Sequence, residues 1–340
     1  MPEITIIIPV YNGQEFIENC FNSILNQSYT DYEVIFINNN SEDDSYKILQ
    51  LLKEKYSFVK VINEHNRGAS YARNSGIDNS NGKYICFVDI DDTLEKDYLK
   101  ILYENLTNTN SDLSMIGINK IENNISKPEL LYNSKISYKN KEDILMLQAG
   151  CYCNALTNFE TSFIGMGTPW DKLFKASIIK NNNIRFNTLL KTGEDTFFLW
   201  NYFNFVNTFT YDNKCLYNYV VYTQSLSRRF VELDTFFDTI KVFYESYKED
   251  FSQITKDSIY YTIFRHFLSL LKKHFTYKDK KFSLKDIKSE LLQVLSKKEM
   301  QFSIINIPLN ILSKKEKIIL KLTKHPSLFS IILYFITFLI

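Results

Sequence analysis

The sequence predicts a doubly wound α/β domain with a mostly parallel sheet, followed by a C-terminal α-helical extension. Over the first part of the chain, short apolar runs typical of buried strands alternate with segments whose apolar residues recur at helical spacing. Polar side chains follow several of these strands directly, as expected where ligands bind beyond the carboxyl ends of parallel strands. After residue 228, long aromatic and lysine-containing helical stretches with few turn signals replace the alternation.

The first strand is predicted at residues 4–10, a continuous apolar run that includes Pro9 and is typical of a central strand covered on both faces. Residues 11–13 break the run, and a helix with one apolar stripe is predicted at residues 16–25. Strand–helix–strand units of this length require right-handed crossovers and parallel strands. The unit then repeats, with strands at 34–37 and 59–62 and a helix at 46–55.

The stretch at residues 82–92 is the most informative part of the chain. Residues 84–88 have the composition of a buried strand, and three aspartates follow almost at once. Asp89 and Asp91 lie two apart, so on an extended backbone both point to one side, where their oxygens could hold a hard divalent cation. The spacing alone favours a solvated turn, with Asp92 as the cap of the next helix.

Three strand ends are expected to meet at one edge of the sheet, because ligands in such folds bind beyond the carboxyl ends of the strands. A helix predicted after the third strand carries Arg73, which could reach a diphosphate in this cleft. The alternative for Arg73 is a surface position on an amphipathic helix, which is the commoner case for an arginine. The side chains expected at the strand ends are those of Pro9, Tyr11, Asn39, Asp89 and Asp91.

Two further sites lie in the second half of the chain. Trp170 is one of two tryptophans, and a core position explains it at least as well as stacking on a ligand. Glu194 and Asp195 precede an aromatic run and resemble a helix start, but a cap explains one acid better than two. The alternation of strand-like and helix-like segments weakens near residue 110 and gives way to helical stretches after residue 228. This change predicts three parts: residues 1–110, 111–228 and 229–340.

Composition argues against several classes of protein. Forty basic and 39 acidic residues give a net charge of +1, so the overall charge offers no argument for nucleic acid as a partner. The five cysteines have no Cys-x-x-Cys or paired histidine spacing, which indicates free thiols in a reducing cytoplasm. No basic region or cleavage site opens the chain, so a secretion signal is not expected.

The tail at residues 314–340 is basic and then apolar. Five lysines stand against the single acid Glu316, and residues 328–340 carry no charge. As a helix, that apolar segment spans only ~20 Å, less than the ~30 Å hydrocarbon core of a bilayer. The pattern fits a peripheral anchor on the anionic inner face of the cell membrane. A terminal helix packed into the core or into a homo-oligomer interface is the open alternative.

Five short motifs occur in order along residues 1–228: residues 6–12, 66–76 and 82–92, Trp170-Asp171-Lys172-Leu173-Phe174, and Gly193-Glu194-Asp195. Together, in this order and at this spacing, they resemble the family 2 glycosyltransferases of GT-A fold. The resemblance implies a Rossmann-like nucleotide-sugar domain and an inverting, non-processive transferase of the bacterial surface-polysaccharide type. It also implies a hexosyl- or N-acetylhexosaminyl-transferase that depends on Mn²⁺ or Mg²⁺ and acts on a glycan or lipid-linked glycan acceptor.

The resemblance also assigns roles to individual residues. Asp195 would be the general base that deprotonates the acceptor hydroxyl, and Glu194 is the alternative base. Asp91 would bind the metal, and Asp89 would face both ribose and metal. The remaining implied contacts are Pro9 and Tyr11 at the base and ribose, Arg73, Ser225 and Ser227 near the donor phosphates, and Trp170 and Lys172 on the acceptor side.

One departure from the family concerns the nucleotide base. Where the family usually has two aspartates and a glycine after the second strand, this chain has Asn38, Asn39 and Asn40. The Asn39 carbonyl could still accept a hydrogen bond from uracil, although its amide could donate to another base. UDP is the expected nucleotide, and a non-catalytic nucleotide-sugar-binding partner subunit is the alternative function. A nucleotidyltransferase is disfavoured, because residues 11–14 supply no Gly-rich basic loop for a triphosphate.

Overall fold

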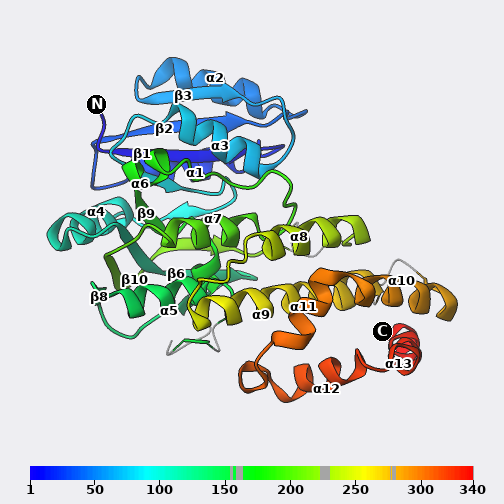
Figure 1. The fold of residues 1–340 in the computed structure, drawn as a ribbon. Coiled ribbons are helices and arrows are strands. Elements are labelled where there is room, and N and C mark those ends of the chain that lie inside the picture. The colour runs from blue at the N-terminus through cyan, green and yellow to red at the C-terminus, as the bar shows by residue number, and fades with distance from the viewer. Residues whose placement is uncertain (154–155, 158–163, 223–229, 276, 278–280, 340) are drawn as a thin grey trace. The chain divides into compact units, whose positions relative to one another are not determined.

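The protein is described from a computed structural model that covers residues 1–153, 156–157, 164–222, 230–275, 277 and 281–339. The chain divides into two compact units, the first made from most of residues 1–222 and the second from most of residues 223–340. Strands and helices alternate in the first unit, whereas the described elements of the second are helical (Figure 1).

A mixed sheet forms the centre of the first unit, in the order β3-β2-β1-β4-β9-β6-β10-β5, with β7 paired to β6 and β8 to β10. Strands β3, β2, β1 and β4 are all parallel, as the strand–helix–strand units predict. β6 and β10 are also parallel, whereas β9 runs antiparallel between β4 and β6. The predicted α/β class is therefore confirmed. The strands are β1 (Ile4–Val10), β2 (Tyr32–Asn38), β3 (Val59–Asn63), β4 (Tyr84–Phe87), β5 (Thr93–Leu94), β6 (Leu113–Glu122), β7 (Ile125–Glu129), β8 (Ile136–Tyr138), β9 (Lys172–Lys175) and β10 (Phe209–Val220).

Helices pack on this sheet, with α3 against β1 and β2 and α4 against β6, β9 and β10. The helix α7 begins at Glu194, as the two adjacent acids predict. The α-helices of the first unit are α1 (Ile17–Leu25), α2 (Ser45–Lys55), α3 (Ala69–Asn79), α4 (Tyr98–Thr109), α5 (Lys141–Gly150), α6 (Ala176–Asn181) and α7 (Glu194–Phe203).

The close approach of α3 to β1 depends on Gly76. A Cβ atom added at Gly76 would lie 2.3 Å from Cγ2 of Ile7, closer than two carbon atoms approach without a shift. Glycine removes this clash because it has no side chain. The packing holds the helix that carries Arg73 directly against the central strand.

The predicted helix cap at Asp92 is wrong. Residues 93–94 form the short strand β5, and α4 begins only at Tyr98. Asp92 is instead buried, where Oδ2 accepts a hydrogen bond from the Tyr217 hydroxyl at 2.6 Å and Oδ1 accepts one from the Val220 amide at 2.9 Å. Both partners belong to β10, so Asp92 fixes the acidic segment at residues 89–92 to a strand more than a hundred residues away in the sequence.

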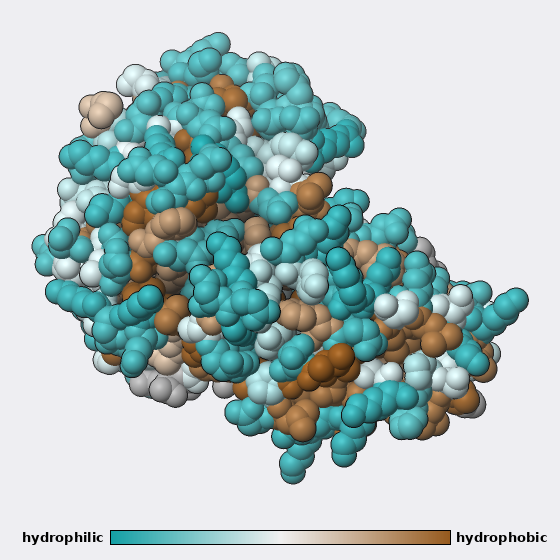
Figure 2. Space-filling model, viewed as in Figure 1, coloured by the Kyte–Doolittle hydropathy of each residue, from teal (hydrophilic) through white to brown (hydrophobic). Residues whose placement is uncertain are grey.

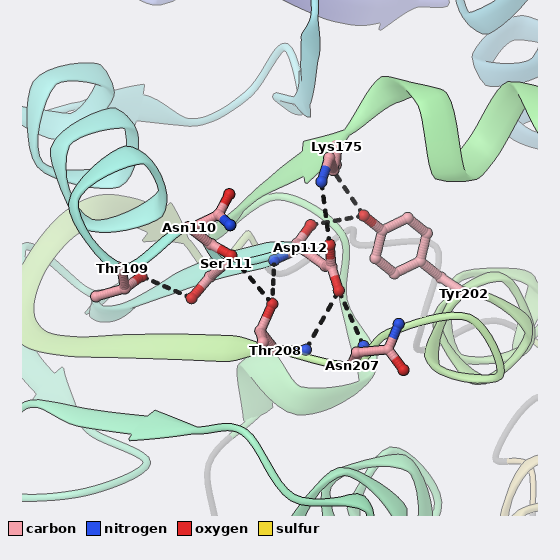
Figure 3. Close-up of polar contacts among 8 residues, drawn as sticks. All are labelled: Thr109, Asn110, Ser111, Asp112, Lys175, Tyr202, Asn207 and Thr208. Carbon is pink, nitrogen blue, oxygen red and sulfur yellow. Dashed lines mark hydrogen bonds and ion pairs between the residues drawn. The ribbon is translucent and has the colours of Figure 1, made fainter.

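A polar network around Asp112 joins the start of β6 to β9, to α7 and to the segment before β10 (Figure 3). Asp112 Oδ2 accepts hydrogen bonds from the amides of Asn207 and Thr208, at 2.9 and 3.2 Å, just before β10. The Tyr202 hydroxyl donates to the Asp112 carbonyl at 2.8 Å and accepts from the Lys175 amide at 3.0 Å. These bonds tie the C-terminal half of α7 to β6 and β9, which fixes the direction of the helix that starts with Glu194.

The second unit is built from α8 (Leu233–Glu245), α9 (Gln253–Leu270), α10 (Leu284–Ser296), α11 (Lys298–Asn306), α12 (Lys314–Leu322) and α13 (Pro326–Leu339). Aromatic rings join three of these helices: Phe302 of α11 lies 5.0 Å, centroid to centroid, from both Tyr244 of α8 and Tyr260 of α9. Among the residues that the structure describes, no helix combines the length and apolar character needed to cross a membrane.

Candidate active site

The ends of β1, β2 and β4 meet at one edge of the sheet, as predicted. Val10 pairs with Asn38 across β1 and β2, and the Asn39 amide donates to the Val10 carbonyl at 2.8 Å. On the other side of β1, the Val88 amide donates to the Ile7 carbonyl at 3.0 Å, directly before Asp89. The parallel register therefore brings the asparagines and the acids to the same edge.

Arg73 joins two groups of acids at this edge. Its Nη2 atom donates to Asp89 Oδ1 at 2.9 Å, and its Nη1 atom donates to Asp195 Oδ1 at 2.8 Å. Glu194 Oε1 lies 4.0 Å from the same Nη1 atom. Residues from α3, from the end of β4 and from the start of α7 thus converge on one guanidinium.

The environment of Arg73 is dry and strongly charged. Its side chain is only 6% exposed, and the guanidinium lies 5.3 Å from the centroid of the Phe186 ring. The surrounding acids raise the pKa of Arg73 in spite of its burial, so the side chain stays charged. Its Nε atom is buried without a hydrogen-bond partner among the described residues. One cation therefore faces three carboxylates, so negative charge is in excess at this site.

The pKa values of the acids reflect this imbalance. Burial raises the pKa of Asp195, and Glu194 and Asp89 raise it further, whereas Arg73 lowers it. Burial, with the added effect of Asp89, raises the pKa of Asp91 from 3.8 to about 6. Half-buried acids of raised pKa that lie close together are typical of functional sites rather than of structural ion pairs alone.

Asp89 and Asp91 fit a hard divalent cation. Both offer carboxylate oxygens at the end of β4, and a dication between them would offset the repulsion that raises the pKa of Asp91. Among the described residues no group of three or more His, Cys, Asp and Glu side chains is arranged to hold a metal. A two-acid site suits Mg²⁺ or Mn²⁺ bound together with phosphate oxygens and water, because such ions seldom use an all-protein cage.

Asn39 is committed to the neighbouring loop. Its Oδ1 atom accepts from the Gly68 amide at 2.8 Å, and its Nδ2 atom donates to the carbonyls of Glu64 and Asn66 at 3.3 and 2.6 Å. Asn38 adds a hydrogen bond to Asn63 Oδ1 at 3.0 Å. These asparagines therefore hold the segment that leads into α3, a role that the sequence did not reveal.

The other predicted donor contacts lie nearby or outside the described residues. Pro9 is half-buried in β1, and Tyr11 is 51% exposed, with the Arg67 guanidinium 6.0 Å from its ring centroid. An exposed ring beside a cation at the strand ends is compatible with base stacking. Ser225 and Ser227 lie outside the described residues.

Trp170 and Lys172 are buried rather than open to a ligand. The Trp170 ring stacks on Tyr217 and Tyr219, with centroids 4.5 and 5.4 Å away. Lys172 is fully buried, and its Nζ atom donates to the carbonyls of Gly165 and Thr168 at 2.6 and 2.7 Å. Both side chains are therefore part of the interior of the first unit, and a direct contact with an acceptor stays a prediction.

Substitution of Arg73 by Met should destabilise the first unit by about 3–5 kcal/mol near neutral pH, because three carboxylates lose their cation. Arg73 lowers the pKa of Asp195, so without Arg73 that pKa rises further in the folded state. The loss should therefore be small below the unfolded-state pKa of about 4 and grow as the pH rises through the raised folded-state values. Urea unfolding of wild type and Arg73→Met at several pH values measures this difference.

Arg67→Met is the matched control, because the Arg67 side chain is 65% exposed in its pair with Glu42. That substitution should cost at most about 1 kcal/mol at every pH. Equal losses for the two variants would contradict the assignment of Arg73 as the cation that holds the acids together.

Comparison with known proteins agrees with the fold. Residues 5–164 match the model of the family described as Glycosyl transferase family 2. The "Cholesterol galactosyltransferase" of Borreliella burgdorferi is 31% identical over 62% of this chain and 60% of its own length. The "Poly(ribitol-phosphate) beta-N-acetylglucosaminyltransferase TarP" of Staphylococcus aureus is 30% identical over 65% of this chain and 63% of its own length.

The chain spans less than two thirds of the length of these curated relatives. Among solved structures, S. aureus TarS 1-349 in complex with UDP-GlcNAc superposes with a TM-score of 0.70 at 20% identity, over 97% of this chain and 89% of that one. At this identity the likeness shows the fold, which is GT-A with a helical C-terminal region. Residues 5–164 therefore form a domain that matches glycosyl transferase family 2.

Proposed function

We propose that the protein is an inverting glycosyltransferase that moves one sugar from a UDP-sugar to a hydroxyl of a glycan or lipid-linked glycan acceptor. The observation that carries the proposal is the bridge from Arg73 to Asp89 and Asp195, at 2.9 and 2.8 Å. The bridge brings Asp89, which is suited to the donor side, and Asp195, which is suited to the acceptor side, together in one partly desolvated site. A hexosyl or N-acetylhexosaminyl donor and a part in surface polysaccharide synthesis complete the proposal.

On the donor side, Asp89 and Asp91 are the residues that would hold Mn²⁺ or Mg²⁺. The ion would supply positive charge for the nucleoside diphosphate, which gains negative charge as the glycosidic bond breaks. Arg73 lies beside Asp89 and can add a fixed positive charge to the same region. Tyr11 offers an exposed ring for the base, and Asn39 shapes this pocket through the Glu64–Gly68 loop rather than with a free amide.

On the acceptor side, Asp195 would take the proton of the attacking hydroxyl. Its Oδ1 atom is held by Arg73, which orients the carboxylate and leaves Oδ2 for the proton. A raised pKa makes Asp195 a better base near neutral pH than an ordinary aspartate. The charges then balance: the hydroxyl oxygen bonds to the anomeric carbon, its proton moves to Asp195, and the diphosphate leaves with the bonding electrons.

The comparisons support this reading in part. One relative is named for a transferase that acts on poly(ribitol-phosphate), another for one that acts on cholesterol, and a structure of like fold holds UDP-GlcNAc. A hydroxyl on a polymer or on a lipid is therefore a reasonable acceptor. The alternative, a non-catalytic partner subunit, is not favoured, because the acids at positions 89, 91 and 195 are all present. We place the reaction in the cytoplasm, at the inner face of the cell membrane.

Thermal unfolding with nucleotide sugars tests the donor site. Wild type should be stabilised by a UDP-sugar with manganese, by about 2.7 kcal/mol at a hundred times the Kd, and less by the same sugar without metal. Asp91→Asn should lose the manganese-dependent part. Asp44→Asn, which changes an exposed acid without a side-chain capping bond, should behave as wild type. A metal effect that survives Asp91→Asn would contradict the metal assignment, and the absence of a shift with every donor tested would contradict the proposed donor site.

The role of Asp195 is tested by Asp195→Asn, which keeps the shape of the side chain but cannot accept the proton. Transfer should fall about 10²–10⁴-fold, while the donor Kd changes little. In wild type, kcat/KM should rise with pH until Asp195 is deprotonated, because the unprotonated carboxylate is the active form. Glu194→Gln is the neighbouring control. Transfer retained in Asp195→Asn but lost in Glu194→Gln would move the base to Glu194.

A further inference from the structure

The outer face of α12 and the start of α13 combine positive charge with exposed apolar groups. Lys314, Ile318 and Lys321 follow one another at helical spacing on the exposed side of α12, and Ile318 is 59% exposed. Figure 2 shows hydrophobic residues beside long hydrophilic side chains over the region of α11 and α12. We call this the basic-apolar surface; its residues are Lys314, Lys315, Ile318, Lys321, Lys324, Leu328 and Ile331.

The one acid of α12 does not neutralise this surface. Glu316 closes a capping box with Ser313, accepting from the Ser313 amide at 2.8 Å. Its other oxygen, Oε1, accepts from the Tyr261 hydroxyl of α9 at 3.0 Å. These hydrogen bonds point the carboxylate toward the helical bundle. The exposed side of α12 is therefore left positive.

α13 has one packed face and one open face. Phe329 and Leu333 are 2% and 4% exposed, and the Phe329 ring meets Phe267 of α9. Leu328 and Ile331, on the other face, are 50% and 41% exposed. α13 is therefore packed on one side only, and its other side leaves apolar groups exposed.

We propose that the basic-apolar surface docks on an anionic lipid bilayer and holds the helices in the plane of the membrane interface. The ammonium groups of the lysines would pair with anionic lipid headgroups, while the side chains of Ile318, Leu328 and Ile331 would enter the boundary between headgroups and acyl chains. The described part of α13, at 14 residues, is too short to cross the bilayer, so it lies on the membrane instead.

Charge complementarity favours lipid over a second copy of the chain. A symmetric dimer through this surface would bring the lysines of both copies together, with no unpaired acid of α12 to separate them. Anionic headgroups supply the missing negative charge, and the acyl region takes up the exposed apolar groups. The inference is independent of the transfer chemistry proposed for the first unit.

Co-sedimentation of the full chain with vesicles tests the proposal. Wild type should sediment with vesicles of phosphatidylglycerol and phosphatidylcholine in equal parts, weakly with phosphatidylcholine alone, and less as salt is added. Neutralising four lysines, in the variant K314Q/K315Q/K321Q/K324Q, should weaken binding to anionic vesicles by roughly a hundredfold or more. Ile318→Gln should weaken it too, because one apolar contact is lost.

The matched control is K47Q/K53Q/K96Q/K100Q, which removes four exposed lysines of the first unit and gives the same net charge. It should bind anionic vesicles as wild type does, and circular dichroism should show both variants folded. Donor binding should be unchanged in the α12 variant, so failure of the membrane proposal and failure of the transferase proposal give different results. Equal loss in both lysine variants, no vesicle binding by wild type, or a dimer that Ile318→Gln dissociates would each overturn the proposal.

Discussion

The proposed site depends on the ion pairs that the buried guanidinium of Arg73 makes with the surrounding acids. It contacts Asp89 at the end of β4 and Asp195 at the start of α7, with Glu194 4.0 Å away. A buried group of this kind is weak evidence for stability, since removing charges from water costs about as much as pairing returns. Three acids around one cation instead leave surplus negative charge. A site that binds a metal ion and takes a proton from an acceptor hydroxyl would need this charge.

The scaffold explains why these groups can meet. Gly76 lets α3 approach β1, which places Arg73 beside the strand ends. Tyr202, bonded to Asp112 and Lys175, fixes α7 and therefore the acids at its first turn. Asp92 binds β10 and holds the acidic segment in place. Each of these residues acts by positioning rather than by contact with a substrate.

Much of this was predictable from local sequence. Continuous apolar runs identify β1, β2 and β4 and imply that their ends converge, so Asp89 and Asp91 could be placed at this edge from the strand pattern, although their spacing alone favours a solvated turn. Long-range partners could not be predicted. The segment after Asp91 reads as a helix cap, because the Tyr217 hydroxyl that claims Asp92 lies 125 residues away. Nor does the local pattern reveal that Asn39 is saturated by its neighbouring loop.

The central claim is that one site holds the donor diphosphate, its metal and the acceptor base. A crystal structure of the full chain with UDP and manganese, read by manganese anomalous scattering, tests it most directly. We expect one manganese peak in contact with the carboxylates of Asp91 and Asp89, with diphosphate oxygens on the same ion and Asp195 facing the empty sugar position. A diphosphate bound away from the ends of β1 and β4, or manganese held by other residues, would contradict it.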